Sequence, residues 1–381
     1  MGGAEISIQM FAEKLVSNGV EITVITSSDT DYTDHVNGVK IYYISHSNLF
    51  WLKDSATKAK IIKPLWYLID LKNLKVENKI KSIIDSEHPD LVHTSNLIGL
   101  SSSIWGLCKK IKIPLLHTLM DYYPMCRKST LYNKGKNCTR RCFSCKVMSF
   151  SKKVQSQKVD AVIGISDFIL GRHLEEGYFR NALRYMIGLP AYMEPVVANP
   201  KKVLNDPLVF GFIGLLARTK GIELLLDSFF ARKDSLKLVV MGKAKNEEYE
   251  NFLKDKYKSS NIEFLGFCDT KRYLPGIDVL VIPSISNEPF GRVIVEAYAY
   301  GVPVLASGRG GIAELVKNGK TGWIFSPETE RDLYAKIDYL KKNSNQILNM
   351  SRNCILEAQK YTIDIILEKY MEIYKTLLLN I

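Results

Sequence analysis

Short apolar runs alternate with helical patterns along most of the chain. A short run of apolar, β-branched residues predicts a buried strand, whereas apolar residues that recur every three or four positions predict an amphipathic helix. In the first half these patterns predict strands at 20–26, 39–44, 89–93, 114–119 and 160–165 and helices at 74–86 and 100–111. Such alternation is typical of parallel sheets with right-handed crossovers.

The second half repeats the pattern after residues 190–207, a stretch with four prolines that we interpret as a linker. Beyond it, strands are predicted at 209–213, 237–241, 261–265, 279–282 and 302–306 and helices at 291–300 and 363–379. A chain of 381 residues is too long for one compact core. We therefore expect an α/β protein with domains at 1–200 and 201–360 and a terminal helix at 361–381.

Two carboxylates stand out in the second half, Glu288 and Glu296, eight positions apart around a strand-to-helix turn. Free backbone N–H groups at the start of a helix favour anions such as phosphate. Glu288 precedes those groups, and Glu296 lies about one and a half turns into the helix on the same side. One carboxylate can therefore meet a sugar beside a phosphate, while the other accepts hydrogen bonds from two vicinal hydroxyls.

This segment resembles the donor-binding signature of family-4 retaining glycosyltransferases, which have the GT-B fold. Five parts of that signature occur in register, namely Glu288, Phe290-Gly291, Glu296, Gly301-Val302-Pro303-Val304 and Gly310-Gly311-Ile312-Ala313-Glu314. The alternative is an ordinary strand–helix repeat with two surface glutamates, but five parts together favour the resemblance. The resemblance implies two Rossmann-like domains that face a cleft, and a terminal helix that packs back on the first domain. It also implies that Glu288, Phe290, Gly291 and Glu296 bind a nucleotide diphosphate sugar.

A glycine loop near the start of the second domain carries further donor-site residues. Gly214 is followed by Lys220-Gly221, an arrangement that can cradle a phosphate, and in the resembled family this Lys pairs with the donor diphosphate. Leu215 stands where that family usually has an Arg, so Arg218 is the candidate substitute. The alternative is a Lys that only caps a loop. By the same resemblance, the backbone around Phe267 meets the nucleotide base.

In the first domain the resemblance is weaker. Residues 117–123 resemble the acceptor-side segment of family members, which places Asp121 there, but Met120 replaces the His that many of them carry. A thioether cannot relay protons. His117 faces the opposite way in the predicted strand, so we interpret it as a structural residue.

The chain begins directly with a helical pattern after Gly2 and Gly3, which the resemblance places in an acceptor-side glycine loop. The central strand that precedes this loop in the family is lacking from the sequence, so we expect either a different translation start or a truncated allele.

Residues 122–159 concentrate the positive charge, with ten Lys or Arg and no Asp or Glu in a chain of net charge +12. Such a surface suits an anionic lipid, a diphosphate or a nucleic acid, but the stretch has no recognisable nucleic-acid motif. Its four cysteines, Cys126, Cys138, Cys142 and Cys145, suit either a structural zinc site or free and redox-active thiols. Seven cysteines without an export signal or an apolar spanning run point to the cytoplasm.

The leading interpretation is a cytoplasmic retaining hexosyltransferase of surface-polysaccharide assembly, with Lys220 and Glu288 as its catalytic residues and no metal needed for catalysis. Aromatic and lysine residues at 48–69 fit a membrane interface or an ordinary core helix equally well, and a membrane would give access to a lipid-linked acceptor. The alternatives are a nucleotide-sugar epimerase of the same fold and a nucleotide-sugar-binding remnant without turnover. An NAD enzyme is disfavoured because no Gly-x-Gly-x-x-Gly follows a strand.

Overall fold

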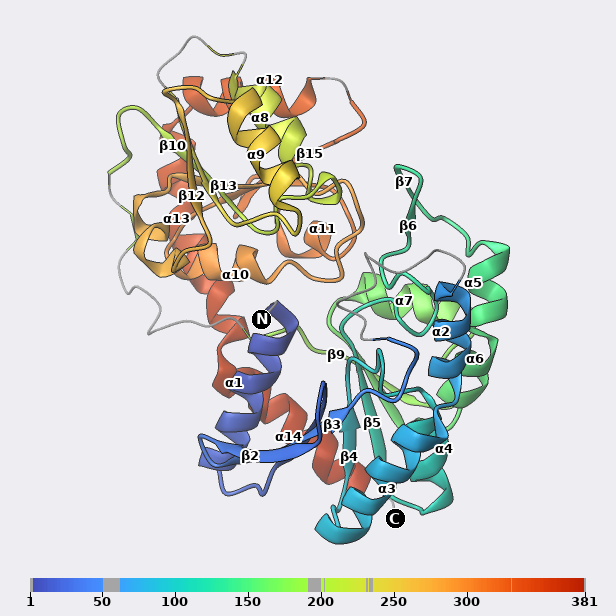
Figure 1. Ribbon diagram of the computed structural model, residues 1–381. Helices are drawn as coiled ribbons and strands as arrows, with labels where there is room; N and C mark the ends of the chain where they lie inside the picture. Colours follow the sequence, from blue (N-terminus) through green and yellow to red (C-terminus); the bar gives the residue numbers. More distant parts are fainter. Residues whose placement is uncertain are drawn as a thin grey trace. The chain divides into compact units, whose positions relative to one another are not determined.

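The structure is a computed structural model of the chain, and it describes residues 3–379 apart from 51–61, 191–199, 202, 231, 233–235 and 330. The chain divides into two compact units (Figure 1). Unit 1 comprises Met1–Asn133, Cys138–Gly188 and Ile363–Ile381, and unit 2 comprises Lys134–Asn137 and Leu189–Thr362. The terminal helix thus belongs to unit 1. Part of the predicted linker and half of the aromatic segment, residues 51–61, lie outside the described residues, whereas Phe50 and Trp66 of that segment are described and buried.

Unit 1 has a four-stranded parallel sheet with the order β4-β5-β8-β9. Its strands are β4 (Val92–Thr94), β5 (Leu115–Leu119), β8 (Ala161–Gly164) and β9 (Leu183–Met186). Every residue of β5 and β8 is buried, as their continuous apolar runs predict. Ser166 caps α7 (Asp167–Glu175) by accepting a hydrogen bond from the Ile169 N–H.

A second sheet of unit 1 has the order β1-β3-β2, from β1 (Thr23–Ser28), β2 (Tyr32–Val36) and β3 (Val39–Ser45). The antiparallel strand β2 was not predicted because its side chains are mostly polar and exposed. Its turn is an Asn37-Gly38 pair in which both residues have positive φ, the strongest short-range signal for a hairpin.

Helices cover both sides of the unit 1 sheets (Figure 1). On one side, α1 (Gly3–Ser17) packs against α14 (Ile363–Leu379), and Lys14 forms a 2.7 Å ion pair with Asp364. The other helices of this unit are α2 (Lys63–Leu71), α3 (Leu74–Glu87), α4 (Ser103–Lys110), α5 (Phe143–Met148), α6 (Phe150–Ser156) and α7. Among the described residues no strand precedes α1, and β1 and β4 belong to separate sheets. That a central first strand is missing here stays a prediction.

Unit 2 is built on a six-stranded parallel sheet with the order β12-β11-β10-β13-β14-β15. Its strands are β10 (Val209–Ile213), β11 (Lys237–Met241), β12 (Ile262–Gly266), β13 (Val279–Ile282), β14 (Val304–Ser307) and β15 (Gly322–Phe325). The strand order reverses between β10 and β13, and in open parallel sheets ligands bind at the carboxyl ends of strands at such a switch point.

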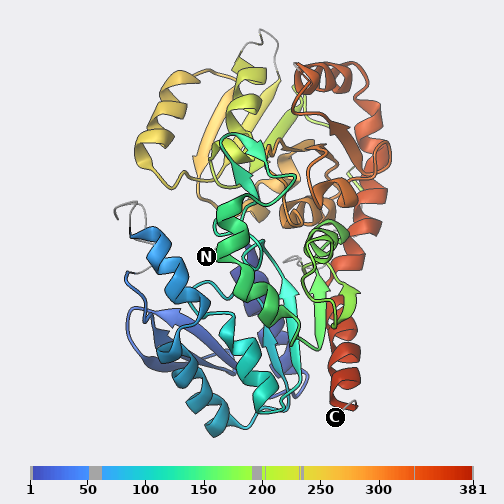
Figure 2. The same cartoon turned by 90° about the vertical axis from the view of Figure 1, so that its right-hand side faces the viewer.

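Helices lie on both faces of the unit 2 sheet (Figure 2). They are α8 (Ile222–Phe230), α9 (Glu247–Lys256), α10 (Arg292–Ala299), α11 (Ile312–Leu315), α12 (Asp332–Lys342) and α13 (Asn345–Ala358). The predictions at 209–213, 237–241 and 279–282 are confirmed to the residue. Short strands β6 and β7 are at Tyr132–Asn133 and Lys136–Asn137.

A fully buried carboxylate holds the start of β10 against β13. Asp278 accepts hydrogen bonds from the backbone N–H groups of Val209 (2.8 Å) and Asn205 (3.2 Å) and forms a 2.7 Å ion pair with Lys201. A buried charge is tolerated only when it is paired and hydrogen-bonded in this way.

Asp278→Ala should therefore lower the free energy of unfolding by about 3–5 kcal/mol, because it leaves Lys201 and the N–H groups of Asn205 and Val209 without the buried carboxylate that they bind. Chemical denaturation measures the change. The control is Asp255→Ala on the exposed face of α9, for which we expect a change within about 0.5 kcal/mol. Equal effects of the two substitutions would contradict the anchoring role of Asp278.

Candidate functional site

Two predicted catalytic residues of unit 2 are in direct contact. Lys220 ends η2 (Arg218–Lys220), just after β10, and Glu288 follows β13. The Lys220 Nζ lies 2.6 Å from the Glu288 Oε1, and the Ser284 hydroxyl donates to the same oxygen at 2.8 Å. The side chains of Lys220 and Glu288 are 35% and 14% exposed, so solvent and ligands can reach the pair. Ser284 was not predicted as a site residue, although the sequence already placed it at the end of a strand.

Glycines allow two backbone segments to approach this ion pair. Gly221 has a φ of +70°, and a Cβ there would lie 1.8 Å from the Pro283 carbonyl oxygen. Gly310 has a φ of +62°, and its Cβ would lie 2.3 Å from the Glu288 carbonyl oxygen. That oxygen instead accepts a 2.8 Å hydrogen bond from the Gly311 N–H. Both glycine motifs thus have a steric reason, since no larger residue fits there.

Glu296 lies on α10, on the buried side of the helix. It is only 9% exposed, and burial raises the pKa of its carboxyl group, against the neighbouring Arg292 charge. The Arg292 Nη2 is 3.2 Å from the Glu296 Oε1, while its Nε and Nη1 are buried without a hydrogen-bond partner among the described residues. α10 begins after Gly291, which has a φ of +112°.

Arg292 is a residue that the sequence analysis missed. A cation in the first turn of a helix opposes the helix dipole, so it requires another reason to be there. The position of this cation was therefore a signal in the sequence. One reason for it in the structure is that the positive charge of Arg292 compensates the buried carboxylate of Glu296.

The other predicted donor residues differ in their surroundings. Phe290 is 4% exposed and packs edge-on against Tyr361, with ring centroids 5.6 Å apart, so it is a core residue. That Phe290 binds the donor stays a prediction. Phe267, by contrast, is 79% exposed at the end of β12.

Arg218 is turned toward Glu223 rather than toward Lys220. Its Nε lies 3.0 Å from the Glu223 Oε1, which also accepts a 2.6 Å hydrogen bond from the Tyr249 hydroxyl. A hollow of about 290 Å³ lies beside it, lined by Leu215, Leu216, Ala217, Arg218, Lys245, Asn246 and Tyr249. Arg218 thus lines this hollow, whereas Lys220 contacts Glu288.

On the acceptor side, Asp121 lies two residues after the end of β5 and is half-buried. Its Oδ1 accepts a 2.7 Å hydrogen bond from the Tyr123 N–H, and burial raises the pKa of its carboxyl group to about 6. Gly3 is the exposed first residue of α1, and Gly2 lies outside the described residues. His117 is 1% exposed, lies 2.9 Å from the Thr94 hydroxyl and stacks on Phe179, so its predicted structural role is confirmed.

Beneath Asp121, unit 1 contains a buried ion pair. Asp70 and Lys152 are 1% and 3% exposed, and their charged atoms are 4.0 Å apart. Asp70 also accepts hydrogen bonds from the Tyr123 hydroxyl at 2.5 Å and the Gly99 N–H at 2.9 Å. Burial lowers the pKa of Lys152 to about 8 and raises that of Asp70.

The four clustered cysteines lie in different surroundings. The sulfurs of Cys126 and Cys145 are both buried and 4.0 Å apart, and the hydrogen bond from Cys145 lowers the pKa of the Cys126 thiol. Cys138 is half-buried, and Cys142 is exposed. In the part of the chain that is described, no three His, Cys, Asp or Glu side chains are placed together to hold a metal ion. The structural zinc therefore stays a prediction.

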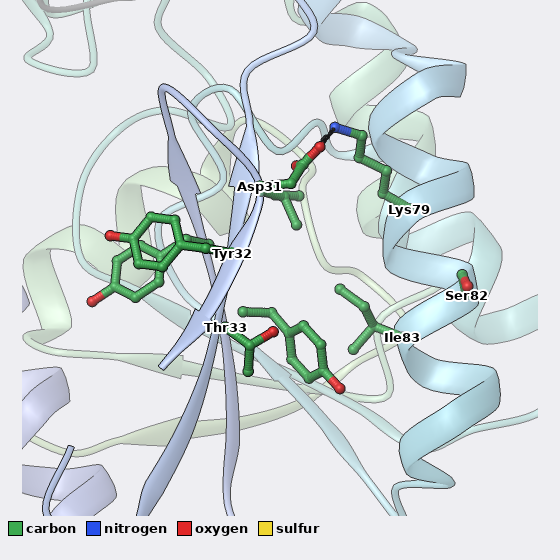
Figure 3. A pocket seen from close by; sticks show the side chains of 9 residues that line it. Asp31, Tyr32, Thr33, Lys79, Ser82 and Ile83 are labelled. Carbon is green, nitrogen blue, oxygen red and sulfur yellow. Dashed lines mark hydrogen bonds and ion pairs between the residues drawn. The ribbon is translucent and has the colours of Figure 1, made fainter. Parts of the chain in front are cut away.

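A second hollow, of about 350 Å³, lies between the β2–β3 hairpin and α3 (Figure 3). Asp31 and Lys79 form a 2.7 Å ion pair at its edge, and Tyr32 stacks on Tyr43 with ring centroids 4.2 Å apart. No residue that the sequence analysis assigned to a site lines this hollow. We therefore leave it outside the candidate site.

The ion pair between Lys220 and Glu288 and the glycine loops beside it all lie in a segment that matches a known protein family. Residues 198–361 match "Glycosyl transferases group 1", and residues 1–181 match "Glycosyltransferase Family 4". The chain belongs to the group 1, family 4 glycosyltransferases. The predicted family is thereby confirmed, and so is the α/β fold of the GT-B type.

Two relatives illustrate the range of this glycosyltransferase family. An uncharacterized 42.6 kDa protein in the cps region of Klebsiella pneumoniae is 35% identical over 322 residues, covering 83% of each chain. An N,N'-diacetylbacillosaminyl-diphospho-undecaprenol alpha-1,3-N-acetylgalactosaminyltransferase of Campylobacter jejuni is 24% identical and covers 95% of this chain and 92% of its own.

Solved structures support the fold assignment. Sucrose-phosphate synthase from Thermosynechococcus elongatus superposes with a TM-score of 0.78 at 20% identity, over 100% of this chain and 94% of its own. HepE from Anabaena, solved in complex with UDP and glucose, gives a TM-score of 0.68 at 17% identity, over 98% and 96%. In this glycosyltransferase, none of the helices described is long and apolar enough to cross a membrane.

Gly221→Ala should disrupt the loop between β10 and α8, for which we predict phosphate binding, because the Cβ would collide with the Pro283 carbonyl and the φ is unfavourable for alanine. We expect at least a tenfold loss of affinity for a nucleotide diphosphate, measured by calorimetry. Gly276→Ala is the matched control, since a Cβ there meets nothing within 4 Å. Unchanged affinity in Gly221→Ala would show that this loop does not contact the nucleotide.

Asp121→Asn should stabilise the enzyme at neutral pH but not in acid. The pKa of Asp121 is about 6 in the folded state, above the ordinary value of 3.8, so ionisation of Asp121 destabilises the folded state. This destabilisation grows as the pH rises from about 4 to 6. Asp121→Asn removes this destabilisation, so the free energy of unfolding should exceed that of the wild type by about 1–3 kcal/mol at pH 7.5 and equal it at pH 4. Denaturant titrations at both pH values test this, with Asp85→Asn on exposed α3 as the control. An equal gain at pH 4 would be inconsistent with this origin.

Proposed function

We propose that this glycosyltransferase moves a hexose from a nucleotide diphosphate sugar to a glycan acceptor with retention of anomeric configuration. The observation that carries the proposal is the contact between Lys220 and Glu288 at the switch point of the unit 2 sheet. A cation there can neutralise a diphosphate, and the adjacent carboxylate can accept hydrogen bonds from sugar hydroxyls.

In the proposed reaction, the bond between the anomeric carbon and the diphosphate oxygen breaks, and the acceptor hydroxyl bonds to the same carbon on the same face. The acceptor proton passes to the departing diphosphate oxygen. Lys220 and the N–H groups at the start of α10 stabilise the charge that develops on the diphosphate. Glu288 orients the hexose, and it is not required as a covalent nucleophile.

We assign Glu296 to the ribose hydroxyls of the donor, with Arg292 as its positioning residue. A carboxylate can accept both vicinal hydroxyls only while it is ionised, and burial alone opposes ionisation of Glu296. The neighbouring Arg292 charge counteracts that effect. On this proposal no divalent metal is needed, because lysine and helix N–H groups supply the positive charge.

The acceptor is proposed to be a lipid-linked glycan at the inner face of the cytoplasmic membrane, in surface-polysaccharide assembly. Support comes from the relative in a cps region and from the relative named for transfer to an undecaprenol-linked sugar. The UDP and glucose bound to a solved structure of the same fold support a nucleotide-sugar donor.

A second candidate is a protein that binds nucleotide sugars without turnover. Met120 favours it, because this position carries no proton-relaying group, and so does the separation of the unit 1 strands into two sheets. Calorimetry with nucleotide sugars and a transfer assay separate the two candidates, since the binding protein would show affinity with no transfer. An epimerase would instead convert the labelled donor to its epimer.

Glu288→Gln and Lys220→Ala should each lower kcat/KM for transfer by about 10²–10⁴-fold, because each removes an interaction with the reacting centre. Transfer of labelled sugar measures the effect, and circular dichroism checks the fold. Lys254→Ala, which removes a 2.8 Å surface ion pair of unit 2, is the control. Wild-type turnover in Glu288→Gln would refute the assignment of the site.

A further inference from the structure

Two consecutive helices of unit 1 expose their apolar side. α5 and α6 meet at Ser149. Four side chains spaced by four, three and four residues lie on one side of them and form what we call the apolar stripe. The stripe consists of Phe143, Val147, Phe150 and Val154, which are 83%, 53%, 68% and 49% exposed.

The opposite side of the same helices is buried although it is polar. Cys145, Ser149, Lys152 and Ser156 follow the same spacing and are 7%, 2%, 3% and 0% exposed. The usual arrangement of a surface helix, with apolar residues inward, is therefore inverted here.

Specific bonds hold the helices in this orientation. The Ser149 hydroxyl accepts hydrogen bonds from Arg141 at 2.8 Å and Tyr178 at 2.9 Å. Lys152 donates to the Tyr123 carbonyl at 3.3 Å and faces Asp70. Turning the helices over would break these bonds, so the stripe cannot enter the core without loss of a buried ion pair.

Charge around the stripe indicates what covers it. Residues 122–159 contain no Asp or Glu, and Arg140 and Lys146 are exposed beside the stripe in sequence. The neighbouring helix α2 contacts α5 and exposes Leu65 and Leu68, each 51%. Apolar side chains with flanking cations are the composition of a surface that lies in the boundary of an anionic bilayer.

We propose that the apolar stripe of α5 and α6 docks this enzyme onto an anionic lipid surface. The phenyl and valine side chains enter the boundary between headgroups and acyl chains, and Arg140 and Lys146 approach lipid phosphates. Only the purpose of this docking surface, which is access to a lipid-linked acceptor, rests on the proposed function.

Flotation of the full chain with vesicles tests the proposal. We expect binding to phosphatidylcholine vesicles that contain about a third phosphatidylglycerol, weaker binding at high salt, and little binding to phosphatidylcholine alone. The double variant F143S/F150S should lower the apparent partition coefficient at least tenfold. The control L356S/L379S removes two leucines of 51% and 85% exposure and should bind like the wild type.

Melting curves and transfer to a water-soluble acceptor check that F143S/F150S is folded, and both should match the wild type. Wild-type transfer by Glu288→Gln together with intact vesicle binding would contradict only the proposed function. Vesicle binding by F143S/F150S equal to the wild type, or no vesicle binding by the wild type, would overturn the docking surface. Self-association that F143S/F150S abolishes, without vesicle binding, would assign the stripe to a second copy of this chain instead.

Discussion

The contact between Lys220 and Glu288 depends on where two neighbouring strands end. β10 and β13 pair in parallel, so the loops that follow them leave the sheet at the same edge, and one carries a cation while the other carries a carboxylate. The pair is partly exposed, and such pairs contribute little to stability. On the proposed function its value is positional, because it presents two opposite charges to a ligand that carries both phosphate and hydroxyl groups. Gly221 and Gly310 allow the backbone to come close enough for this arrangement.

The strands of unit 2 and its glycine loops could be predicted because their signals are local. Buried parallel strands have continuous apolar runs, and a glycine near a strand end reports a close backbone approach whether or not the partner segment is known. The β2 strand was missed although the Asn37-Gly38 turn was a local signal for it. Strand assignment from apolar content fails for an edge strand whose side chains face water.

Other features required the tertiary structure. Phe290 belongs to a motif, but a motif position does not tell whether a side chain meets a ligand or the core, and its packing partner Tyr361 lies about seventy residues later. Spacing alone also could not place the cysteines. Cys126 and Cys145 are buried beside each other, whereas Cys138 is half-buried and Cys142 is exposed.

The orientation of α5 and α6 shows how a buried polar group decides against the hydrophobic pattern. Periodicity alone would place Phe143, Val147, Phe150 and Val154 inward, since that side is the more apolar one. The inward position of Lys152 is costly by itself, and removal of Asp70 would leave a buried charge without a partner. The hydrogen-bond partners of the polar side of the helices, Asp70, Tyr123 and Tyr178, are held in place inside unit 1. The polar side can therefore form its hydrogen bonds only when it faces inward. The apolar side must then face outward, and its exposure in water is unfavourable unless an apolar environment covers it.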